Sequence, residues 1–399
     1  MENVYKVKGV VQHYNWGGKE FIPQLLGINN KEGKPFAEYW IGAHPNAPAV
    51  LEDENILLQA LITENTTGVL GQRVAARFGS LPYLFKILDV RQMLSIQVHP
   101  SKESAIEGFK KENEAGIALT APNRNYKDQN HKPELMVALS DFWLLHGFKN
   151  ENELKNIFQR IPAFSFLQAS FKKGGYKALY EEVMTMQQDK VDEVLAPLMK
   201  EILPRYQNET LQKSDEHFWA ARAVLTFCKE GFYDRGIFSI YLFNLLHLKQ
   251  GEGIYQPAGL PHAYLEGQNV EVMAASDNVL RAGLTDKHID VAELMKHVKF
   301  EATRPNIIKA RSAAEQSFEA PVDEFLLTRF LIKETVSFSA ESATIIFIYE
   351  GEGSINYGEQ AIALNRGEAA LVPAGKDVSV ISSSASLIFF SVTTPMDKN

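Results

Sequence analysis

The pattern of hydrophobic and polar residues divides the chain into β-rich and α-rich stretches. Short apolar runs alternate with turn residues in residues 82–147, which is typical of strands joined by loops. From Gly236 the chain returns to strand-like runs, first FSIYLFNLLHL at 238–248 and then GEGIYQPAG at 251–259. After Pro321, strand-like runs with glycine-containing turns continue almost to the end of the sequence. Most of the chain is therefore predicted to form β-sheet.

Helix-forming residues dominate residues 151–229 instead. Apolar residues recur there at the spacing of one helical face, with charged residues between them. The residues on this face are Val191, Val194, Leu195, Leu198 and Ile202. Pro197 interrupts the pattern and predicts a break or a kink, because proline lacks the N–H group and clashes with the preceding turn. A second apolar stripe, DVAELMKHV within residues 289–298, predicts a shorter helix.

Two segments share the same spacing of glycine and proline. Residues 251–262 read GEGIYQPAGLPH, and residues 367–378 read GEAALVPAGKDV. In each, a strand leads into a Pro-Gly turn and a second strand, as in a small antiparallel barrel. The spacing resembles the second motif of the cupin superfamily, whose last position is often a metal-binding histidine. That position holds His262 in the first copy and Val378 in the second, which predicts two jelly-roll barrels with a metal in only one.

Composition and charge exclude several classes of function. The 399-residue chain has a net charge of -8, whereas a general nucleic-acid binder needs a basic surface to neutralise phosphates. Its one cysteine, Cys228, allows neither an intramolecular disulfide nor a cysteine-based zinc site, and suits a reducing compartment. The most apolar stretch, residues 237–248, is too short to span a bilayer, and residues 1–10 lack the apolar core of a secretory signal. We therefore expect no nucleic-acid partner and no membrane partner.

Four side chains from three separate segments of the sequence form a metal-ligand set. LSIQVHP at 94–100 has strand character, so Gln97 and His99, two residues apart, point the same way. Glu134 follows a proline in NHKPEL, and His262 ends the first Pro-Gly segment. Two imidazoles, one carboxylate and one amide oxygen suit zinc, and can also hold manganese, iron or cobalt.

The other histidines are open alternatives as ligands. His131 is the most tempting of them, because it lies three residues before Glu134. Spacing alone does not rank the candidates. The remaining seven are His13, His44, His146, His217, His247, His288 and His297.

Five longer strings carry a resemblance to a known family. They are YNWGGKEF at 14–21, AEYWIGAHPNAPA at 37–49, LPYLFKILDVRQMLSIQVHPSKESA at 81–105, YKDQNHKPELMVAL at 126–139 and PAGLPHAYLEGQNVEVMAASDNVLRAGLTDKHIDVAELMKHVKF at 257–300. SIQVHP, NHKPEL and SDNVLRAGLT are highly specific in combination. On these strings the chain resembles a type I phosphomannose isomerase.

The resemblance implies an enzyme that interconverts mannose 6-phosphate and fructose 6-phosphate and binds one zinc ion per chain. It places the metal ligands at Gln97, His99, Glu134 and His262. It places the active-site arginine at Arg281, and the substrate-pocket residues at Lys132, Tyr264, Glu271 and Lys287. Lys86 also lies in a family motif and is a candidate for proton transfer.

The chemistry of this isomerisation explains the residue types. A proton moves between neighbouring carbons through an enediolate, whose negative charge has to be stabilised. A divalent metal can polarise the oxygens or organise the pocket. Arg281 is always protonated, so it suits charge stabilisation rather than proton abstraction. The base is left open among Lys132, Lys86, Glu271, Asp277 and a metal-bound water.

The phosphate group needs its own contacts. The sequence has no P-loop and no dinucleotide fingerprint, so nucleotide binding is not expected. Cationic side chains and hydroxyls around the barrel mouth are the expected partners. The candidates are Ser101, Lys102, Lys132, Arg281 and Lys287, and Asp277 completes the predicted substrate-binding set.

Three alternative functions stay open at this point. An iron-dependent cupin oxygenase is disfavoured by Gln97, because a fourth ligand leaves fewer open positions. A non-catalytic sugar-binding cupin is disfavoured because Arg281 and all ligand positions are present. An isomerase of a different sugar is not distinguished, since a pocket admits related sugars with modest penalties.

The sequence thus predicts a mainly β chain with an α-helical insertion and two cupin-type jelly-roll barrels. Residues 1–150 and 236–314 are expected to form the metal-bearing domain, and residues 151–235 the helical insertion. Residues 315–399 are expected to form a C-terminal barrel without metal. We expect a cytoplasmic monomer that takes a sugar phosphate as its small-molecule substrate.

Overall fold

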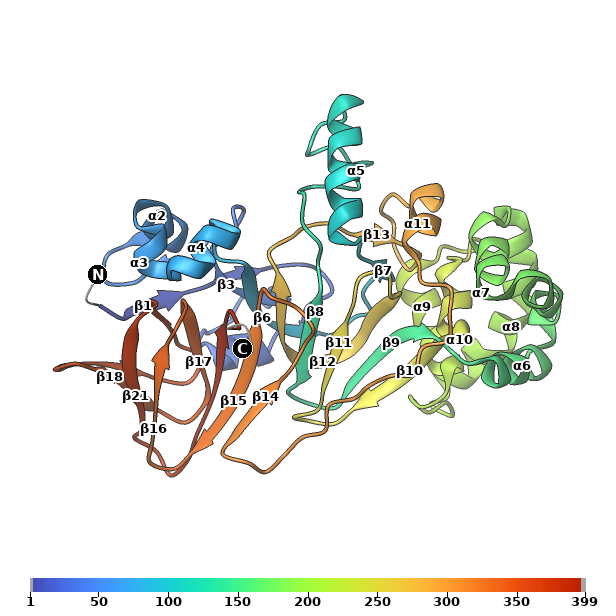
Figure 1. Cartoon of the computed structure of the whole chain (residues 1–399). Coiled ribbons are helices and arrows are strands. Elements are labelled where there is room, and N and C mark those ends of the chain that lie inside the picture. The colour runs from blue at the N-terminus through green and yellow to red at the C-terminus, as the bar shows by residue number, and fades with distance from the viewer. Residues whose placement is uncertain (1–2, 396–399) are drawn as a thin grey trace.

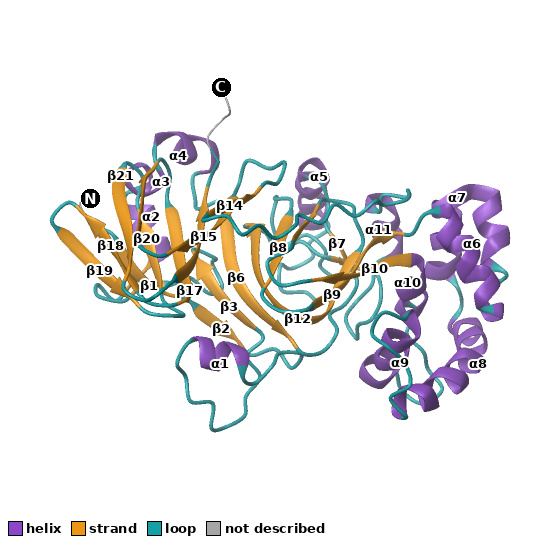
Figure 2. Cartoon of the chain, turned by 90° about the horizontal axis from the view of Figure 1, so that it is seen from below, coloured by secondary structure: helices purple, strands orange, loops and turns teal. Residues whose placement is uncertain are grey.

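The computed structural model describes residues 3–395, and residues 1–2 and 396–399, which include the end of the predicted C-terminal barrel, lie outside it. Three antiparallel sheets follow one another along the long axis, and a group of helices lies at one end (Figures 1 and 2). The prediction of a mainly β chain with an α-helical insertion is confirmed.

A ten-stranded sheet forms the centre of the molecule. Its strands are β2 (Val10–Gln12), β3 (Glu38–Gly42), β6 (Tyr83–Val90), β7 (Gln97–Val98), β8 (Glu134–Ala138), β9 (Phe142–Phe148), β10 (Phe243–Leu248), β11 (Gly253–Gln256), β12 (His262–Ala274) and β13 (Leu280–Arg281). β12 pairs with β7 and β9 near its start and with β6 and β8 over its second half. Two walls of the sheet therefore share one long strand.

The side chains of β6 alternate between two environments. Tyr83, Phe85 and Ile87 belong to the apolar cluster shared with the neighbouring sheet. Lys86 and Leu88 point to the opposite face, which encloses the interior of the ten-stranded sheet. The two-residue period of a strand thus packs one face against another sheet and leaves the other face free for chemistry.

An eight-stranded sheet and a four-stranded sheet complete the β part. The first has the order β14 (Glu315–Phe318), β15 (Leu326–Ile332), β22 (Leu387–Thr393), β17 (Thr344–Glu350), β20 (Ala369–Val372), β1 (Tyr5–Lys8), β4 (Val50–Leu51) and β5 (Ile56–Leu57). The second has the order β16 (Thr335–Ala340), β21 (Lys376–Ser382), β18 (Gly353–Tyr357) and β19 (Gln360–Leu364). They face each other across an apolar layer that includes Phe330, Ile346 and Val380.

The strand orders of these sheets are open, so two closed jelly-roll barrels are not confirmed. The sheets instead pack face to face across apolar layers. β1, β4 and β5, from the start of the chain, pair within the same sheet as the C-terminal strands. The predicted division into domains stays a prediction.

The repeated Pro-Gly segments have the same local conformation. Gly251 and Gly367 have φ values of 83° and 84°, and Gly259 and Gly375 have values of 81° and 77°. Positive φ values of this kind favour glycine, so the repeated glycines mark the same two turns. The last position of the second copy, Val378, is buried in the C-terminal core.

The predicted helical stretch contains four α-helices and a short 3-10 helix. They are α6 (Glu151–Arg160), η1 (Pro162–Phe164), α7 (Leu167–Thr185), α8 (Gln188–Gln207) and α9 (Glu216–Phe227). The sequence predicts a break or a kink at Pro197: α8 continues through Pro197, so the break is wrong, and the kink stays a prediction. Pro197 lies on the exposed side of α8, where water can reach the carbonyl that loses its partner, while Leu195 and Leu198 stay buried.

Two stretches predicted as strands or loops are helices. Residues 236–242 form α10 (Gly236–Leu242), and the expected strand begins only at Phe243. All seven residues of α10 are buried, and a uniformly apolar run has no period that separates helix from strand. Residues 102–114 form α5 (Lys102–Glu114), which projects from the sheets in Figure 1.

The remaining helices are short. α11 (Val291–His297) confirms the helix predicted within residues 289–298. The others, for which the sequence analysis made no prediction, are α1 (Phe21–Leu25), α2 (Leu58–Glu64), α3 (Thr66–Leu70) and α4 (Gln72–Phe78). None of the helices in residues 3–395 combines the length and the apolar character that crossing a membrane requires.

The C-terminal core depends on stacked aromatic rings, which makes its stability testable. Phe389 is fully buried, and its ring centroid lies 4.6 Å from that of Phe330. We expect Phe389→Ala to lower the free energy of unfolding by about 3–5 kcal/mol in urea titrations. Phe232→Ala, at a half-exposed position, should change it by less than about 0.5 kcal/mol. Similar losses in the two variants would contradict this core.

Candidate metal centre

Three of the four predicted ligands meet in the interior of the ten-stranded sheet. The Nε2 atom of His99 lies 3.3 Å from Oε1 of Glu134, and Nε2 of His262 lies 3.2 Å from Oε2 of the same carboxylate. One ligand atom from each residue lies within 4.8 Å of the other two. All three side chains are buried. This is the arrangement of a metal site with two nitrogen ligands and one oxygen ligand.

Backbone carbonyls orient both imidazoles. Nδ1 of His99 lies 2.9 Å from the carbonyl oxygen of Asn278, and Nδ1 of His262 lies 2.9 Å from that of Leu260. Each Nδ1–H therefore donates to a carbonyl and leaves Nε2 as the lone-pair side of the ring. Nε2 of His99 is buried without a hydrogen-bond partner, because its contact with Glu134 is short but not aligned as a hydrogen bond. A buried nitrogen lone pair of this kind fits a metal ligand.

The protonation states also suit metal binding. Burial lowers the pKa of His99 to about 4, so the ring is neutral at pH 7. Burial alone would raise the pKa of Glu134, but Lys132 and the contacts with His99 and His262 hold it well below its usual range. The site thus presents a neutral imidazole and a carboxylate, the forms that coordinate a cation.

Gln97 lies beside this triad. Its backbone pairs with His262 on one side and with Arg281 on the other. Gln97, Glu134 and His262 line one small cavity. The other residues that line this cavity are Glu38, Lys86, Leu88, Leu94, Ser95, Lys132, Ala263, Tyr264 and Glu271. The structure therefore brings together most of the residues that the sequence analysis selected.

Lys86 is held between two carboxylates in the wall of this cavity. Its Nζ lies 3.3 Å from Glu271 and 3.6 Å from Glu38. Burial opposes the charge, yet Glu38 and Glu271 raise the pKa of Lys86, so it stays an ammonium ion. Burial and Glu134 raise the pKa of Glu271, whose Oε1 accepts a 2.8 Å hydrogen bond from the hydroxyl of Tyr264.

Three predicted cations lie at or near the cavity. Lys132 Nζ lies 3.0 Å from Oε1 of Glu134. Burial lowers the pKa of Arg281, and burial followed by the nearby charge of Arg281 lowers that of Lys287. Within residues 3–395, neither Arg281 nor Lys287 makes an ion pair with a carboxylate inside 4 Å. The nearby charge of Asp286 partly offsets the lowering of both pKa values, but Asp286 forms no ion pair with either group, so both cations are suited to bind an anion.

The remaining candidates have partners of their own. The hydroxyl of Ser101 caps α5 by accepting the backbone N–H of Ser104 at 3.2 Å. Lys102 is exposed and donates to Oδ1 of Asn130 at 2.8 Å. His131 pairs with Glu324 at 2.6 Å, so this tempting alternative is not part of the buried triad.

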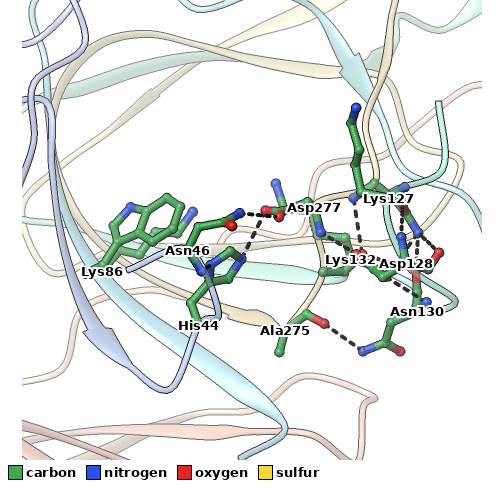
Figure 3. A network of polar contacts seen from close by, with 12 residues as sticks. His44, Asn46, Lys86, Lys127, Asp128, Asn130, Lys132, Ala275 and Asp277 are labelled. Carbon is green, nitrogen blue, oxygen red and sulfur yellow. Dashed lines mark hydrogen bonds and ion pairs between the residues drawn. The ribbon is translucent and has the colours of Figure 1, made fainter. Parts of the chain in front are cut away.

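A polar network behind the triad was not predicted. Figure 3 shows Asp128 between Asn130 and the backbone of Asp277. The amide group of Asn278 donates to the backbone oxygens of Asp128 and Asn130 and accepts the N–H of Lys127. The same residue's carbonyl holds His99. A backbone carbonyl leaves no signal in a sequence, although Asn278 does lie in the specific string SDNVLRAGLT.

A second and larger cavity lies away from this centre. It has a volume of about 750 Å³ and lies between the helical segment and strands β9 and β10. Its walls include Trp143, Tyr206, Phe218 and His247, and none of the predicted site residues. The buried donors and charges make the smaller cavity the candidate functional site despite its size.

Fold and centre together define a mainly β protein with a buried site for a divalent metal. Residues 4–151 match the family model "Phosphomannose isomerase type I, catalytic domain", and residues 314–392 match "Mannose-6-phosphate isomerase, cupin domain". The mannose-6-phosphate isomerase of Escherichia coli (strain K12) is 38% identical over 382 residues, which cover 93% of this chain and 95% of that protein. The chain therefore belongs to the type I phosphomannose isomerase family.

A plant relative and a solved structure agree. Mannose-6-phosphate isomerase 1 of Arabidopsis thaliana is 32% identical, over 94% of this chain and 90% of that protein. The crystal structure of mannose 6-phosphate isomerase from Salmonella typhimurium, bound to the substrate fructose 6-phosphate and zinc, superposes with a TM-score of 0.88 at 36% identity. That match covers 98% of this chain and all of the other. The family model that matches residues 314–392 supports the assignment of the C-terminal part as a cupin domain.

The triad predicts that a divalent metal stabilises the fold, and that removal of the Glu134 carboxylate abolishes this stabilisation. We expect added divalent metal to raise the free energy of unfolding of the metal-free chain. The increase should be about 2.7 kcal/mol when the free metal concentration is a hundred times the dissociation constant. Glu134→Gln should lose this response and the bound metal, measured by elemental analysis, because it removes the anionic ligand between His99 and His262. His247→Ala, on the far strand β10, should keep both. Full metal content in Glu134→Gln would contradict the site.

Proposed function

We propose that this chain interconverts mannose 6-phosphate and fructose 6-phosphate, and that it binds one zinc ion through Gln97, His99, Glu134 and His262. The buried triad, with a lone pair of His99 that has no hydrogen-bond partner, carries this proposal. Membership of the family, and the zinc and sugar phosphate named for the Salmonella typhimurium structure, support the choice of metal and substrate.

The donor set fits a catalytic zinc site. Two imidazoles, a carboxylate and an amide oxygen leave room for a substrate oxygen, unlike a closed site of four thiolates. When bound, zinc supplies Lewis-acid stabilisation to oxygens that gain negative charge. The chain's own residues hold the ligands: Asn278 and Leu260 orient the two imidazoles through their carbonyls.

Lys86 and Arg281 are suited to stabilise the enediolate. Lys86 stays positively charged between Glu38 and Glu271, so it offers a fixed ammonium group in the cavity wall. Arg281 pairs through its backbone with Gln97 and has no carboxylate partner within 4 Å among the described residues. Fixed positive charges in a buried pocket stabilise developing negative charge without reorganisation.

The other charged residues divide into phosphate and proton-transfer candidates. Lys287 is exposed and lies near Arg281, so we assign it to the phosphate. Ser101 and Lys102, which follow the ligand His99 in the sequence, are further candidates for the phosphate. Lys132, Glu271 and Asp277 are the candidates for proton transfer. Both carboxylate oxygens of Glu271 are occupied, by Tyr264 and Lys86, which favours a positioning role for Glu271.

The finer architecture also belongs to this proposal. Two barrels of the cupin type, with a helical insertion between the halves of the first, explain the repeated Pro-Gly turns with matched φ values. A cytoplasmic location is supported by the single cysteine. A monomeric state is part of the proposal and is measurable by sedimentation velocity.

A coupled assay tests the function directly. The purified chain is incubated with mannose 6-phosphate, and fructose 6-phosphate is followed with and without chelator. We expect turnover that the chelator abolishes and added zinc restores. A chain that binds the sugar phosphate without converting it would be a sugar-binding cupin instead, and the proposal would be wrong.

Arg281→Ala separates charge stabilisation from metal binding. We expect it to keep the bound metal, because Arg281 contributes no ligand, and to lose about 100- to 1000-fold in kcat. Elemental analysis and steady-state kinetics measure the two effects on the same preparation. Arg205→Ala, on the exposed side of α8, serves as the matched control. Loss of metal in Arg281→Ala would show that the arginine acts on the structure of the centre.

A further inference from the structure

His44 contacts a carboxylate that is 233 positions away in the sequence. Its side chain is 6% exposed, and its Nε2 lies 3.1 Å from Oδ1 of Asp277. Figure 3 shows His44 and Asn46 on one side of Asp277, with Asp128 on the other. His44 belongs to AEYWIGAHPNAPA, one of the strings that resemble the family, yet neither the metal centre nor the cavity wall uses it.

The hydrogen bonds define the tautomer of His44. Its Nδ1 accepts the backbone N–H of Asn46 at 3.3 Å, so the proton resides on Nε2 and is donated to Asp277. The amide group of Asn46 donates to the other carboxylate oxygen at 3.4 Å. The backbone N–H of Asp277 donates to Asp128 at 2.8 Å. Each carboxylate oxygen thus has one protein donor and can accept another hydrogen bond.

The His44–Asp277 pair is continuous with the wall of the catalytic cavity. The His44 ring meets the ring of Trp40 edge to face, with centroids 4.9 Å apart. The ammonium group of Lys86 lies 5.1 Å from the centroid of the same indole. Asp277 remains 38% exposed, although His44 itself is buried. An accessible carboxylate with unused lone pairs, linked to the cavity wall through His44, Trp40 and Lys86, is able to bind a hydroxyl group.

The charges around Asp277 keep it ionised. Burial alone would raise its pKa, but the hydrogen bond from His44 and the positive charges of Lys132 and Lys86 lower it. The other titratable groups that act on or contact Asp277 are Tyr14, Lys127 and Asp128. A carboxylate with a lowered pKa is a weaker base but stays a charged hydrogen-bond acceptor at neutral pH.

We propose that His44 is a positioning residue that fixes Asp277 as an ionised acceptor for a hydroxyl group of the sugar phosphate. The inference rests on the proposed isomerase function. A purely structural link between two loops would not need a carboxylate with free lone pairs facing solvent and two lysines. Asp277 contacts the sugar, whereas His44 acts through Asp277 and sets its orientation and charge.

Replacement of His44 tests the proposal. His44→Phe keeps the aromatic contact with Trp40 but removes the donor, and His44→Gln keeps an N–H donor. We expect His44→Phe to lower kcat/KM by about 10- to 100-fold, mainly through KM, because a hydrogen bond to a charged group is lost. His44→Gln should recover a large part of this loss. His247→Phe, which keeps its stacking on Trp143 away from the site, is the matched control.

The pH profile separates positioning from a structural effect. Without the His44 donor the pKa of Asp277 rises, so the loss of activity on acidification begins at a higher pH than in the unmodified chain. In an Asp277→Asn background, His44→Phe should cause little further loss, because His44 acts through the carboxylate. Metal content and thermal stability should match those of the unmodified chain.

The outcomes that overturn the proposal are distinct from failure of the isomerase assignment. Additive losses in the double variant, or an unshifted acidic limb in His44→Phe, would show that His44 does not act through Asp277. If His44→Phe does not fold, His44→Leu with Asp277→Asn supplies the same comparison, because leucine also removes the donor. If the unmodified chain has no isomerase activity, NMR titration of the Asp277 carboxyl group in the His44 variants still reports whether His44 lowers its pKa, and no change overturns that step.

Discussion

The buried carboxylate of Glu134 is the constraint on which the functional part of this structure depends. An isolated carboxylate in a protein interior is costly unless charges and hydrogen bonds compensate it. Here His99, His262 and Lys132 provide the compensation within 3.3 Å. The two histidines come from segments far from Glu134 in the chain, so the charge is tolerated only when the ten-stranded sheet has assembled around it. Folding of the sheet and formation of the metal centre are thereby coupled.

The two-residue period of the strands places this chemistry without disturbing the core. On β6, Lys86 faces the cavity while Phe85 packs against the eight-stranded sheet, with its ring centroid 5.7 Å from that of Phe347. On β8 and β12, Glu134 and Glu271 face the cavity, and their neighbours Leu135 and Val272 join the same apolar layer. A rigid apolar face therefore supports each charged side chain, which is the condition for a preorganised site.

The sequence allowed the metal ligands, Lys86, Lys132 and Tyr264 to be selected, because each lies in a contiguous, specific string, and the structure brings them together. It could not reveal contacts made through the backbone, such as the Asn278 carbonyl that orients His99. The sequence could not predict that α10 is a helix, because all seven of its residues are apolar or small and no period distinguishes a helix from a strand there. Pro197 is exposed to solvent, which explains why α8 continues through it, and this exposure could not be predicted from the sequence.

The two Pro-Gly segments show how one local structure serves two purposes. Their glycines have matched φ values, yet the final position is His262 in one and Val378 in the other. His262 is held at the centre by the carbonyl of Leu260, whereas Val378 contributes to a core layer with Phe330 and Phe389. A histidine at the Val378 position would bring a polar ring into that apolar layer, which is costly unless a polar partner compensates it. The C-terminal copy therefore retains the turn for packing between the eight-stranded and four-stranded sheets.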